Sequence, residues 1–453
     1  MKIVIIGCGK VGQLLTDYLS KENHDIVVID TNQEKIESTV HRFDVMGLCG
    51  NGANYNILKE AGAHVADIVI SVTESDELNI LAGLTAKMMG SNHLIARVRN
   101  PDYIKQREFL RDKFGFSMIV NPEEEAASEI RRMVTFPSAL KIDTFSKRNL
   151  ELAEIKLEKG NKIIGLKLLE LKKVTKTSIL ICAVSRGDEV FIPSGDFLLQ
   201  EGDHIHVTGT HKDLSIFSMD IGVNKEKIKN VMIVGASRIA FYLAKQLSVL
   251  GIKVKIIEKN HERCVEFAER LPYATIIEAD GSDEDVLLEE GIDRTDAFIC
   301  LTGLDEENII LSMAVKKLGA KKSISKVNRA SLFSLVDKIG VDNIVCPKNL
   351  VSTQITGYVR AKDSGDEHSS VKTLYKIVND QVEALEFVAT EKFRYTSIKL
   401  SDMKIKKNIL IAGIYRNNQM IVPKGNDTIE LNDHVIIVSS NSTIKKLSDI
   451  IGD

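Results

Sequence analysis

The sequence is poor in several residues and patterns that mark particular classes of protein. Its 453 residues contain no tryptophan, 7 prolines and 6 cysteines. No apolar run approaches the length of about 18 residues that a membrane-spanning helix needs. The cysteines are scattered and form no Cys-x-x-Cys pair, which favours free thiols in a reducing compartment over a disulfide framework or a zinc site. The scarcity of proline argues against long disordered linkers.

The N-terminus leads directly into a short apolar run, Ile3–Ile6. This run is too short for the apolar region of a signal peptide, and no cleavage site follows it. We therefore expect a cytoplasmic protein. The formal net charge of −3 argues against a dedicated nucleic-acid binder, although charge can segregate locally.

An internal repeat with an offset of about 228 residues divides the chain into two similar halves. The run Ile3–Gly7 matches Val231–Gly235, and the small-lobe run Leu180–Val184 matches Leu410–Ile414. Other matched pairs are Asp30 with Glu258, Gly62 with Gly291, Thr73 with Thr302, Asn79 with Asn308, and Val120-Asn121-Pro122 with Val345-Cys346-Pro347. Each half therefore has a large lobe followed by a small one, which we place at 1–140, 141–228, 229–366 and 367–453.

Short apolar runs alternate with helical patterns in the first lobe. Strands are expected at 2–6, 26–29, 45–49, 67–72 and 93–98, with helices at 11–19, 32–42, 55–61 and 77–89. This alternation predicts a Rossmann-type, doubly wound parallel sheet, which binds ligands at the carboxyl ends of its strands. The small lobe is expected to be an α+β module of about 70 residues, with a helix near 166–171.

The first strand is followed by Gly7-Cys8-Gly9-Lys10-Val11-Gly12, the glycine pattern of a dinucleotide-binding turn. Gly7 allows the tight turn, Gly9 lets the backbone approach a diphosphate, and Gly12 lets the helix pack closely. Asp30 lies 18 residues after Gly12, at the end of the second strand. A carboxylate there accepts hydrogen bonds from ribose hydroxyls and repels a 2′-phosphate, which favours NAD or an adenine nucleotide over NADP. The alternative is a structural turn that has lost its ligand.

The second copy departs from this pattern. The equivalent positions are Gly235, Ala236, Ser237, Arg238, Ile239 and Ala240, with Glu258 in place of Asp30. Arg238 could face a phosphate, and Glu258 could hold a ribose. The alternatives are that this copy is retained for packing, or that it binds a different nucleotide.

Polar residues at other strand ends complete the candidate sites. Thr73-Glu74 and Thr302 are expected beside the nucleotide. Arg97 and its counterpart Lys326 could meet a phosphate, the next subunit or a surface carboxylate. Asn51 and Asp280 follow the third strand; we favour helix capping for both over a direct role beside the adenine pocket.

Several acidic and histidine clusters do not predict a metal site. Glu123–Glu125 and Asp283–Asp285 are typical of the acidic first turn of a helix. The histidines at 204, 206 and 211 lack the carboxylate or cysteine pattern of a metal site. Catalytic motifs are also missing, and each small lobe is too short for a usual substrate domain. Two tandem nucleotide sites without catalytic chemistry suggest a sensor rather than an enzyme.

Several of these motifs resemble those of a known protein family. Met1–Gly12 is similar to the opening of TrkA, the regulatory subunit family of the Trk potassium-uptake systems. Gly50-Asn51-Gly52, Ala66-Asp67, the segment Thr73–Asn79 and the segment Ala96–Tyr103 are similar as well. The tandem layout also agrees, and the resemblance spans the whole chain.

The resemblance implies tandem RCK (KTN) domains in a peripheral protein on the inner face of the cell membrane. It implies a homo-oligomeric ring, expected to be a tetramer, beneath a separate membrane subunit that translocates potassium. NAD or NADH, together with ATP or ADP, would change the shape of the ring and gate the pore. The nucleotide contacts carried over by position are Gly7, Cys8, Gly9, Lys10, Val11, Asp30, Thr73, Glu74 and Arg97. Two alternatives remain, a regulator of another cation channel or antiporter and an NAD-dependent oxidoreductase.

Overall fold

The computed structural model describes residues 1–145, 150–187, 189–223, 226–329, 332, 343–363, 371, 373–378, 381–417, 419–440 and 444–452. The chain forms two compact units. One contains Met1–Glu125 and Pro347–Val359, and the other contains Ala126–Cys346 and Arg360–Asp453. Among the described residues, no helix has both the length and the apolar character needed to cross a bilayer.

The first unit is built on a six-stranded parallel sheet of order β3-β2-β1-β4-β5-β6. Its strands are β1 (Lys2–Ile6), β2 (Asp25–Asp30), β3 (Met46–Cys49), β4 (Ile68–Ser71), β5 (His93–Arg97) and β6 (Met118–Val120). The helices that follow them are α1 (Lys10–Ser20), α2 (Gln33–Phe43), α3 (Tyr55–Glu60), α4 (Asp76–Met89), α5 (Pro101–Ile104), α6 (Arg107–Phe114) and α7 (Pro122–Thr135), with a 3₁₀ turn at Ala63–Val65. The predicted Rossmann-type sheet is confirmed.

Both faces of this sheet are covered, which explains why its strands are almost continuously apolar. Ile3 and Ile5 pack in one buried cluster with Leu15 of α1. Val4 and Ile6 point the other way and pack in a second buried cluster. The sheet therefore exposes only its edges and strand ends, and the carboxyl ends carry the polar residues.

The second large lobe repeats the first, with a parallel sheet of order β14-β13-β12-β15-β16-β17. Its strands are β12 (Asn230–Val234), β13 (Lys253–Glu258), β14 (Thr275–Glu278), β15 (Ala297–Cys300), β16 (Lys322–Lys326) and β17 (Asn343–Val345). Its helices are α9 (Arg238–Val249), α10 (His261–Arg270), α11 (Glu284–Glu289), α12 (Asp305–Lys317) and α14 (Pro347–Asp363), with a 3₁₀ turn at Ile292–Arg294.

The two small lobes are antiparallel five-stranded sheets, of order β10-β9-β11-β8-β7 and β18-β19-β22-β20-β21. The first contains β7 (Lys141–Phe145), β8 (Leu150–Lys156), β9 (Leu180–Arg186), β10 (Glu189–Phe191), β11 (His204–Thr210) and α8 (His211–Asp220). The second contains β18 (Thr373–Ile377), β19 (Val382–Val388), β20 (Ile409–Arg416), β21 (Gln419–Ile421) and β22 (His434–Ser439). A 3₁₀ segment lies at Leu168–Lys173 in the first small lobe, and two lie at Leu400–Asp402 and Leu447–Ile450 in the second. The helix expected near 166–171 is therefore a 3₁₀ segment, displaced by about two residues.

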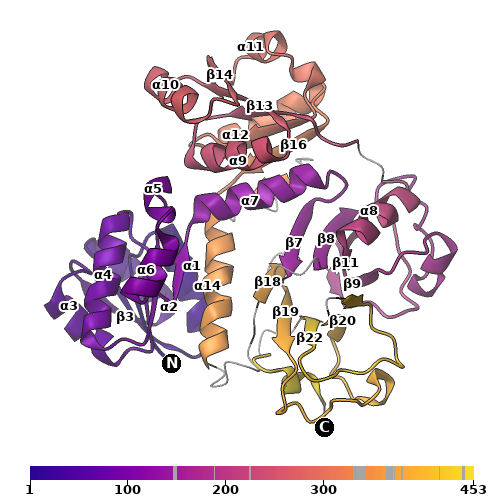
Figure 1. The fold of residues 1–453 in the computed structure, drawn as a ribbon, viewed down its shortest axis with the longest axis horizontal. Helices are drawn as coiled ribbons and strands as arrows, with labels where there is room; N and C mark the ends of the chain where they lie inside the picture. Colours follow the sequence, from indigo (N-terminus) through magenta and orange to yellow (C-terminus); the bar gives the residue numbers. More distant parts are fainter. Residues whose placement is uncertain are drawn as a thin grey trace. The chain divides into compact units, whose positions relative to one another are not determined.

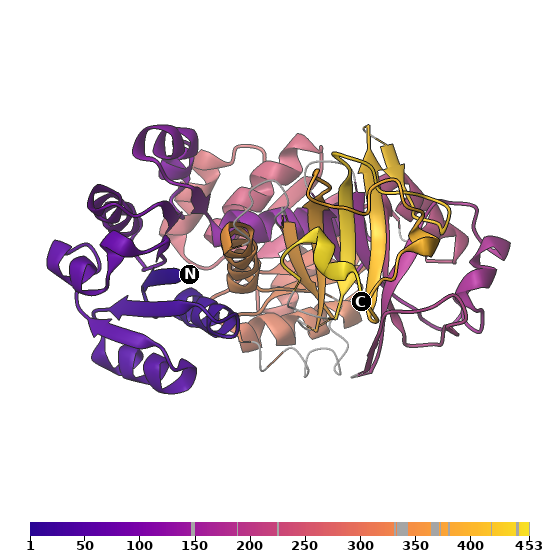
Figure 2. The same ribbon diagram turned by 90° about the horizontal axis from the view of Figure 1, so that it is seen from below.

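The small lobes pack against each other through one apolar cluster. Cys182 and Ala183 of β9 contact a group that includes Ala384, Ala412 and Ile436. The hydroxyl of Thr208 also donates to the carbonyl of Ala412, at 2.9 Å. Figures 1 and 2 show the strands of the two small lobes next to each other.

The last helix of each large lobe packs away from the sheet that precedes it in the chain. Val351, Ile355 and Val359 of α14 belong to the buried core of the first unit, beside α1 and α2 (Figure 1). Conversely, α7 runs on into the second unit, where Ser128 accepts a hydrogen bond from Gln246 of α9 at 3.1 Å. The segment 347–359 therefore lies with the first large lobe in space, although in sequence it follows the strands of the second large lobe.

Polar contacts from equivalent strands hold these helices. Nζ of Lys322, at the start of β16, donates to the carbonyls of Met133, Pro137 and Ala139, at 3.0, 3.3 and 3.0 Å. A cation at the C-terminal end of α7 also interacts favourably with the helix dipole. The equivalent residue of β5 is His93, which forms a hydrogen bond of 3.1 Å with the hydroxyl of Tyr358 on α14.

Replacing Lys322 with methionine should destabilise the second unit. Methionine nearly preserves the side-chain length but leaves buried carbonyls without their donor, which should lower the free energy of unfolding by about 1–3 kcal/mol. The neighbouring Lys321 is the matched control, since its side chain is 56% exposed and pairs with Glu226 and Asp296. Lys321→Met should cost at most about 1 kcal/mol. Urea unfolding followed by circular dichroism measures both, and equal losses would contradict the role of Lys322.

Candidate functional site

The glycine-rich turn of the first lobe connects β1 to α1 in a conformation that two glycines require. Gly7 has φ +106°, in the region that side chains disfavour. A Cβ on Gly12 would lie 1.8 Å from the carbonyl oxygen of Gly7, so the helix can approach the strand only if residue 12 lacks a side chain. Gly9 differs, because a Cβ there would meet no heavy atom of the described residues within 4 Å. The space beside Gly9 is therefore open to a ligand.

Asp30 fastens this turn to the end of β2. Its Oδ2 accepts a hydrogen bond of 2.7 Å from the backbone N–H of Cys8, and its Oδ1 accepts one of 2.9 Å from Asn32. Each carboxylate oxygen has a second lone pair, so these bonds leave acceptor capacity for ribose hydroxyls. The carboxylate thus both orients the turn and remains able to bind sugar.

A buried asparagine organises the other side of the site. Oδ1 of Asn79 accepts from the backbone N–H of Thr73 at 2.8 Å and from its hydroxyl at 2.7 Å. Nδ2 of Asn79 donates to the carbonyl of Arg97 at 2.9 Å. This residue joins the ends of β4 and β5, yet the sequence indicated it only as a repeat match and as part of a segment that carries the family resemblance. Its recurrence as Asn308, in the same place relative to Thr302, was the signal that could have revealed it.

Arg97 points back across the strand ends and donates to the carbonyl of Thr73. Burial, and secondly the positive charge of Arg99, lower the pKa of Arg97 to about 10. It therefore remains a cation at neutral pH. The side chain of Glu74 is exposed, and its carbonyl accepts a hydrogen bond from Arg99.

The remaining residues of the turn differ in what they can contribute. Cys8 and Val11 are buried side chains, 1% and 5% exposed, so they can contact a ligand only through their backbone. Lys10 is exposed at the first position of α1.

The second lobe repeats most of these contacts. Oε2 of Glu258 accepts from the N–H of Ala236 at 2.7 Å, as Asp30 does from Cys8. Asn308 accepts from the N–H of Thr302 and donates to the carbonyl of Lys326, both at 2.9 Å. Lys326 in turn donates to the carbonyl of Thr302. The framework around the second site is thus preserved.

The turns themselves differ between the two lobes. Ser237 is the N-cap residue of α9, and its hydroxyl accepts a hydrogen bond from the N–H of Ala240 at 3.3 Å. Arg238 is exposed, whereas Ile239 is buried in the core.

The capping role expected for Asn51 and Asp280 is wrong. The residues that cap the following helices are Asn54 and Asp283. Asn51 instead accepts from the N–H of Ala53, and Asp280 from that of Ser282, both at 2.9 Å. Such Asx turns compete with capping, because the side chain bonds to its own backbone two residues on.

The acidic clusters behave as expected of helix starts. Glu123–Glu125 lie in the first turn of α7, and Asp283 caps α11. His204 and His211 pair with Glu154 and Glu151, at 2.8 and 3.0 Å. Over the described part of the chain, no group of three or more His, Cys, Asp or Glu side chains could hold a metal ion.

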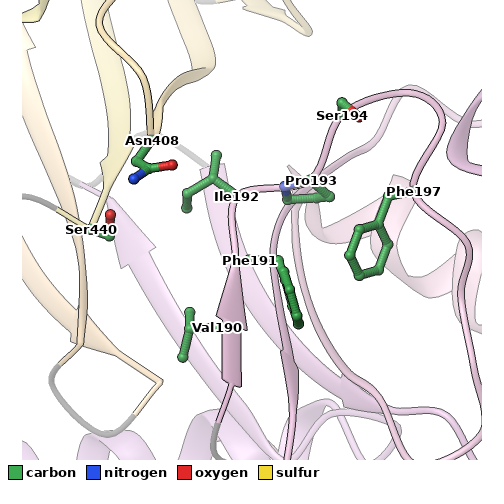
Figure 3. Close-up of a pocket in the computed structure, with 8 residues that line it drawn as sticks. All are labelled: Val190, Phe191, Ile192, Pro193, Ser194, Phe197, Asn408 and Ser440. Carbon is green, nitrogen blue, oxygen red and sulfur yellow. The ribbon is translucent and has the colours of Figure 1, made fainter.

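A separate small pocket of about 280 Å³ lies between the two small lobes (Figure 3). Val190 and Ile192 lie on the side of Asn408 and Ser440, whereas Phe191 lies on the side of Phe197. It contains none of the residues predicted to bind nucleotide.

Comparison with known families defines the class of this chain. Residues 3–122 and 231–347 match the TrkA-N domain, and residues 152–219 and 385–452 match the TrkA-C domain. The protein is therefore a tandem TrkA-N/TrkA-C protein, as the repeat predicted. The lobe boundaries at 140, 228 and 366 stay predictions.

The similarity to curated relatives extends over the full chain. The chain is 30% identical over 450 residues to the Trk system potassium uptake protein TrkA homolog of Archaeoglobus fulgidus, covering 99% of this chain and 100% of the relative. It is 28% identical to the Trk system potassium uptake protein TrkA of Haemophilus influenzae, covering 97% and 96%. The chain belongs to the TrkA family of Trk system potassium uptake proteins, which confirms the resemblance.

Solved structures with the same fold include the GsuK channel. It matches with a TM-score of 0.66 at 18% identity, covering 97% of this chain and 76% of that one. A structure of the GsuK channel bound to NAD matches with a TM-score of 0.64 over the same shares.

Thiol labelling should distinguish the reactivity of Cys8 from that of Cys49, the two cysteines nearest the first site. Burial, together with the negative charge of Asp30, raises the pKa of Cys8 to about 12, so its reactive thiolate is scarce at about pH 8. Cys49 is exposed at the end of β3. We expect iodoacetamide to label Cys49 in the folded protein and Cys8 only after unfolding, as measured by peptide mass spectrometry. Comparable labelling of both in the folded protein would show that the turn around Cys8 is open.

Proposed function

We propose that this protein is a nucleotide-sensing regulatory subunit of a potassium-uptake system. Its first lobe binds NAD or NADH, with ATP or ADP as further ligands. Binding controls a separate membrane subunit that translocates potassium. The protein acts as a homo-oligomeric ring, a tetramer, on the cytoplasmic face of the membrane, and it catalyses no reaction of its own.

The observation that carries this proposal is the geometry of the first glycine-rich turn. The open space beside Gly9 lies at the N-terminus of α1, where backbone N–H groups and the helix dipole favour a diphosphate. Asp30 is held at the end of β2 by two backbone N–H groups, in the place suited to a ribose. The proposed first site consists of Gly7, Cys8, Gly9, Lys10, Val11, Gly12, Asp30, Thr73, Glu74 and Arg97.

The comparisons support the two remaining parts of the proposal. Relatives that match over nearly the whole chain are named potassium uptake proteins. The structurally similar GsuK channel has been solved with NAD and, at a TM-score of 0.50, with ADP. The GsuK similarity also favours a second candidate, in which the membrane partner is a potassium channel rather than a Trk transporter.

Loss of the Asp30 carboxylate should weaken binding at the first site so far that none is detected at nucleotide concentrations that saturate the wild type. Removing hydrogen bonds to a charged group costs about 1.5–3 kcal/mol, which corresponds to roughly a 10- to 100-fold weaker affinity. Calorimetric titration with NAD, NADH, ATP and ADP measures this for the wild type and for Asp30→Ala. Because the carboxylate repels a 2′-phosphate, NADP should bind the wild type more weakly than NAD.

The matched control is Asp196→Ala, which removes an exposed small-lobe carboxylate that pairs with Lys167. It should bind NADH as the wild type does. Equal affinity of wild type and Asp30→Ala would refute the placement of the pocket.

Potassium transport tests the regulatory role. Cells that lack this protein should take up potassium more slowly, and Asp30→Ala should remove the response of uptake to nucleotide. Restoration by Asp196→Ala is the control. Co-purification of a membrane protein identifies the partner as a Trk transporter or a channel. Unchanged uptake after deletion would reject the proposal.

A further inference from the structure

The two glycine-rich turns have almost the same backbone but satisfy their helix ends differently. Gly9 has φ −74° and ψ −169°, and Ser237 has φ −91° and ψ 167°. No side chain among the described residues caps α1. In α9, the hydroxyl of Ser237 accepts from the N–H of Ala240. The second helix therefore supplies, from within the chain, the acceptor that a phosphate oxygen would provide to the first.

The serine also takes up the space that the ligand would need. A Cβ at Gly9 would meet no heavy atom of the described residues within 4 Å. The equivalent space in the second lobe holds the Cβ and hydroxyl of Ser237. A diphosphate would have to displace this side chain and break its hydrogen bond.

The rest of the second turn is also satisfied internally. The carbonyl of Gly235 accepts from the N–H of Ser237 at 2.9 Å. At the position of Gly12, where a Cβ would clash with the carbonyl of Gly7, the second copy has Ala240. The second turn therefore accommodates a methyl group that the first could not.

A carboxylate adds an electrostatic obstacle. The hydroxyl of Thr302 donates to Oε2 of Glu307 at 2.7 Å, and a Cβ on Gly235 would lie 3.2 Å from the backbone nitrogen of Thr302. Glu307 is thus held close to the turn. The equivalent residue in the first lobe is Leu78. A carboxylate beside the turn repels a phosphate, and partial burial strengthens that repulsion.

We infer that Ser237 and Glu307 are specificity-determining residues that exclude the diphosphate of a dinucleotide from the second lobe. Each chain then holds a single dinucleotide, in the first lobe, and the second glycine-rich turn is a self-capped copy. This inference rests on the proposed function, because it requires the first lobe to bind NAD or NADH.

Calorimetric titration of the full-length protein with NADH tests the inference. The wild type should bind one NADH per chain, and Asp30→Ala should show no binding at NADH concentrations that saturate the wild type. Adding Ser237→Gly, Ala240→Gly and Glu307→Leu to Asp30→Ala should restore one site, in the second lobe. A further Glu258→Ala substitution should abolish that restored site.

The reciprocal substitution, which introduces the serine of the second turn into the first, tests the inference without relying on the variant with several substitutions. Gly9→Ser should fold as the wild type does, since Gly9 has an ordinary φ and free space. It should weaken NADH binding by about tenfold or more, because the hydroxyl takes the place of a charged hydrogen-bond partner. Gly425→Ser, in the second small lobe, is the control and should leave binding unchanged. Circular dichroism and the thermal midpoint report whether each variant folds.

The outcomes separate this inference from the proposal on which it rests. A wild type that binds two NADH, of which Asp30→Ala removes one, would overturn the inference and leave the proposed function standing. Unchanged binding by Gly9→Ser, or a folded multiple variant that binds nothing, would overturn the roles of Ser237 and Glu307. A wild type that binds no nucleotide would overturn both.

Discussion

The carboxylate at the end of the second strand is the contact on which each large lobe depends. Asp30 and Glu258 differ in length, yet each accepts a hydrogen bond of 2.7 Å from the backbone N–H that follows the first glycine of the turn. This bond ties the first strand, its turn and the second strand together, where buried backbone donors need a partner. The same group lies where a ribose would bind. On the proposed function, one side chain therefore serves both the structure of the turn and the recognition of a ribose, so the turn keeps its structure whether or not a ligand binds.

The duplicated lobes show how such a divergence can occur without disturbing the fold. In both copies the buried asparagine accepts from the N–H of the strand-end threonine, and the carboxylate anchor accepts from the N–H of the turn. The differences that bear on a diphosphate include positions 9, 12 and 78 of the first copy, whose counterparts are Ser237, Ala240 and Glu307. These positions face the turn, where a change alters what can bind but leaves the sheet intact. One chain can thus keep two similar frameworks of which, on the proposed function, one responds to a dinucleotide.

The last helix of each large lobe packs against the other large lobe, so each half of the duplicated chain contributes to the structure of the other. Helix α14 completes the apolar core of the first unit, and α7 is held in the second by Lys322 and by Gln246. A single copy would leave part of an apolar sheet face uncovered and the carbonyls at a helix end without a donor, and both are costly. The tandem arrangement therefore supplies to each sheet a helix that its own half does not.

The local pattern of the sequence determined the elements and their order. Apolar runs, glycine spacing and strand-end polar residues predicted both parallel sheets, the glycine-rich turn and the position of Asp30 at the end of the second strand. They could do so because burial on both faces of a sheet and a tight turn each restrict which residue types can occur. The capping role of Asn51 was wrong, and the helix expected near 166–171 is a 3₁₀ segment at Leu168–Lys173, because turn chemistry and short helical segments depend on competing local hydrogen bonds. Only the tertiary structure revealed the bonds of Asn79, the packing of α14 on the first sheet, the contacts of Lys322 and the position of Glu307 beside the second turn. These contacts join residues that are far apart along the chain or depend on the direction of a side chain. The spacing of residues in a sequence determines neither property.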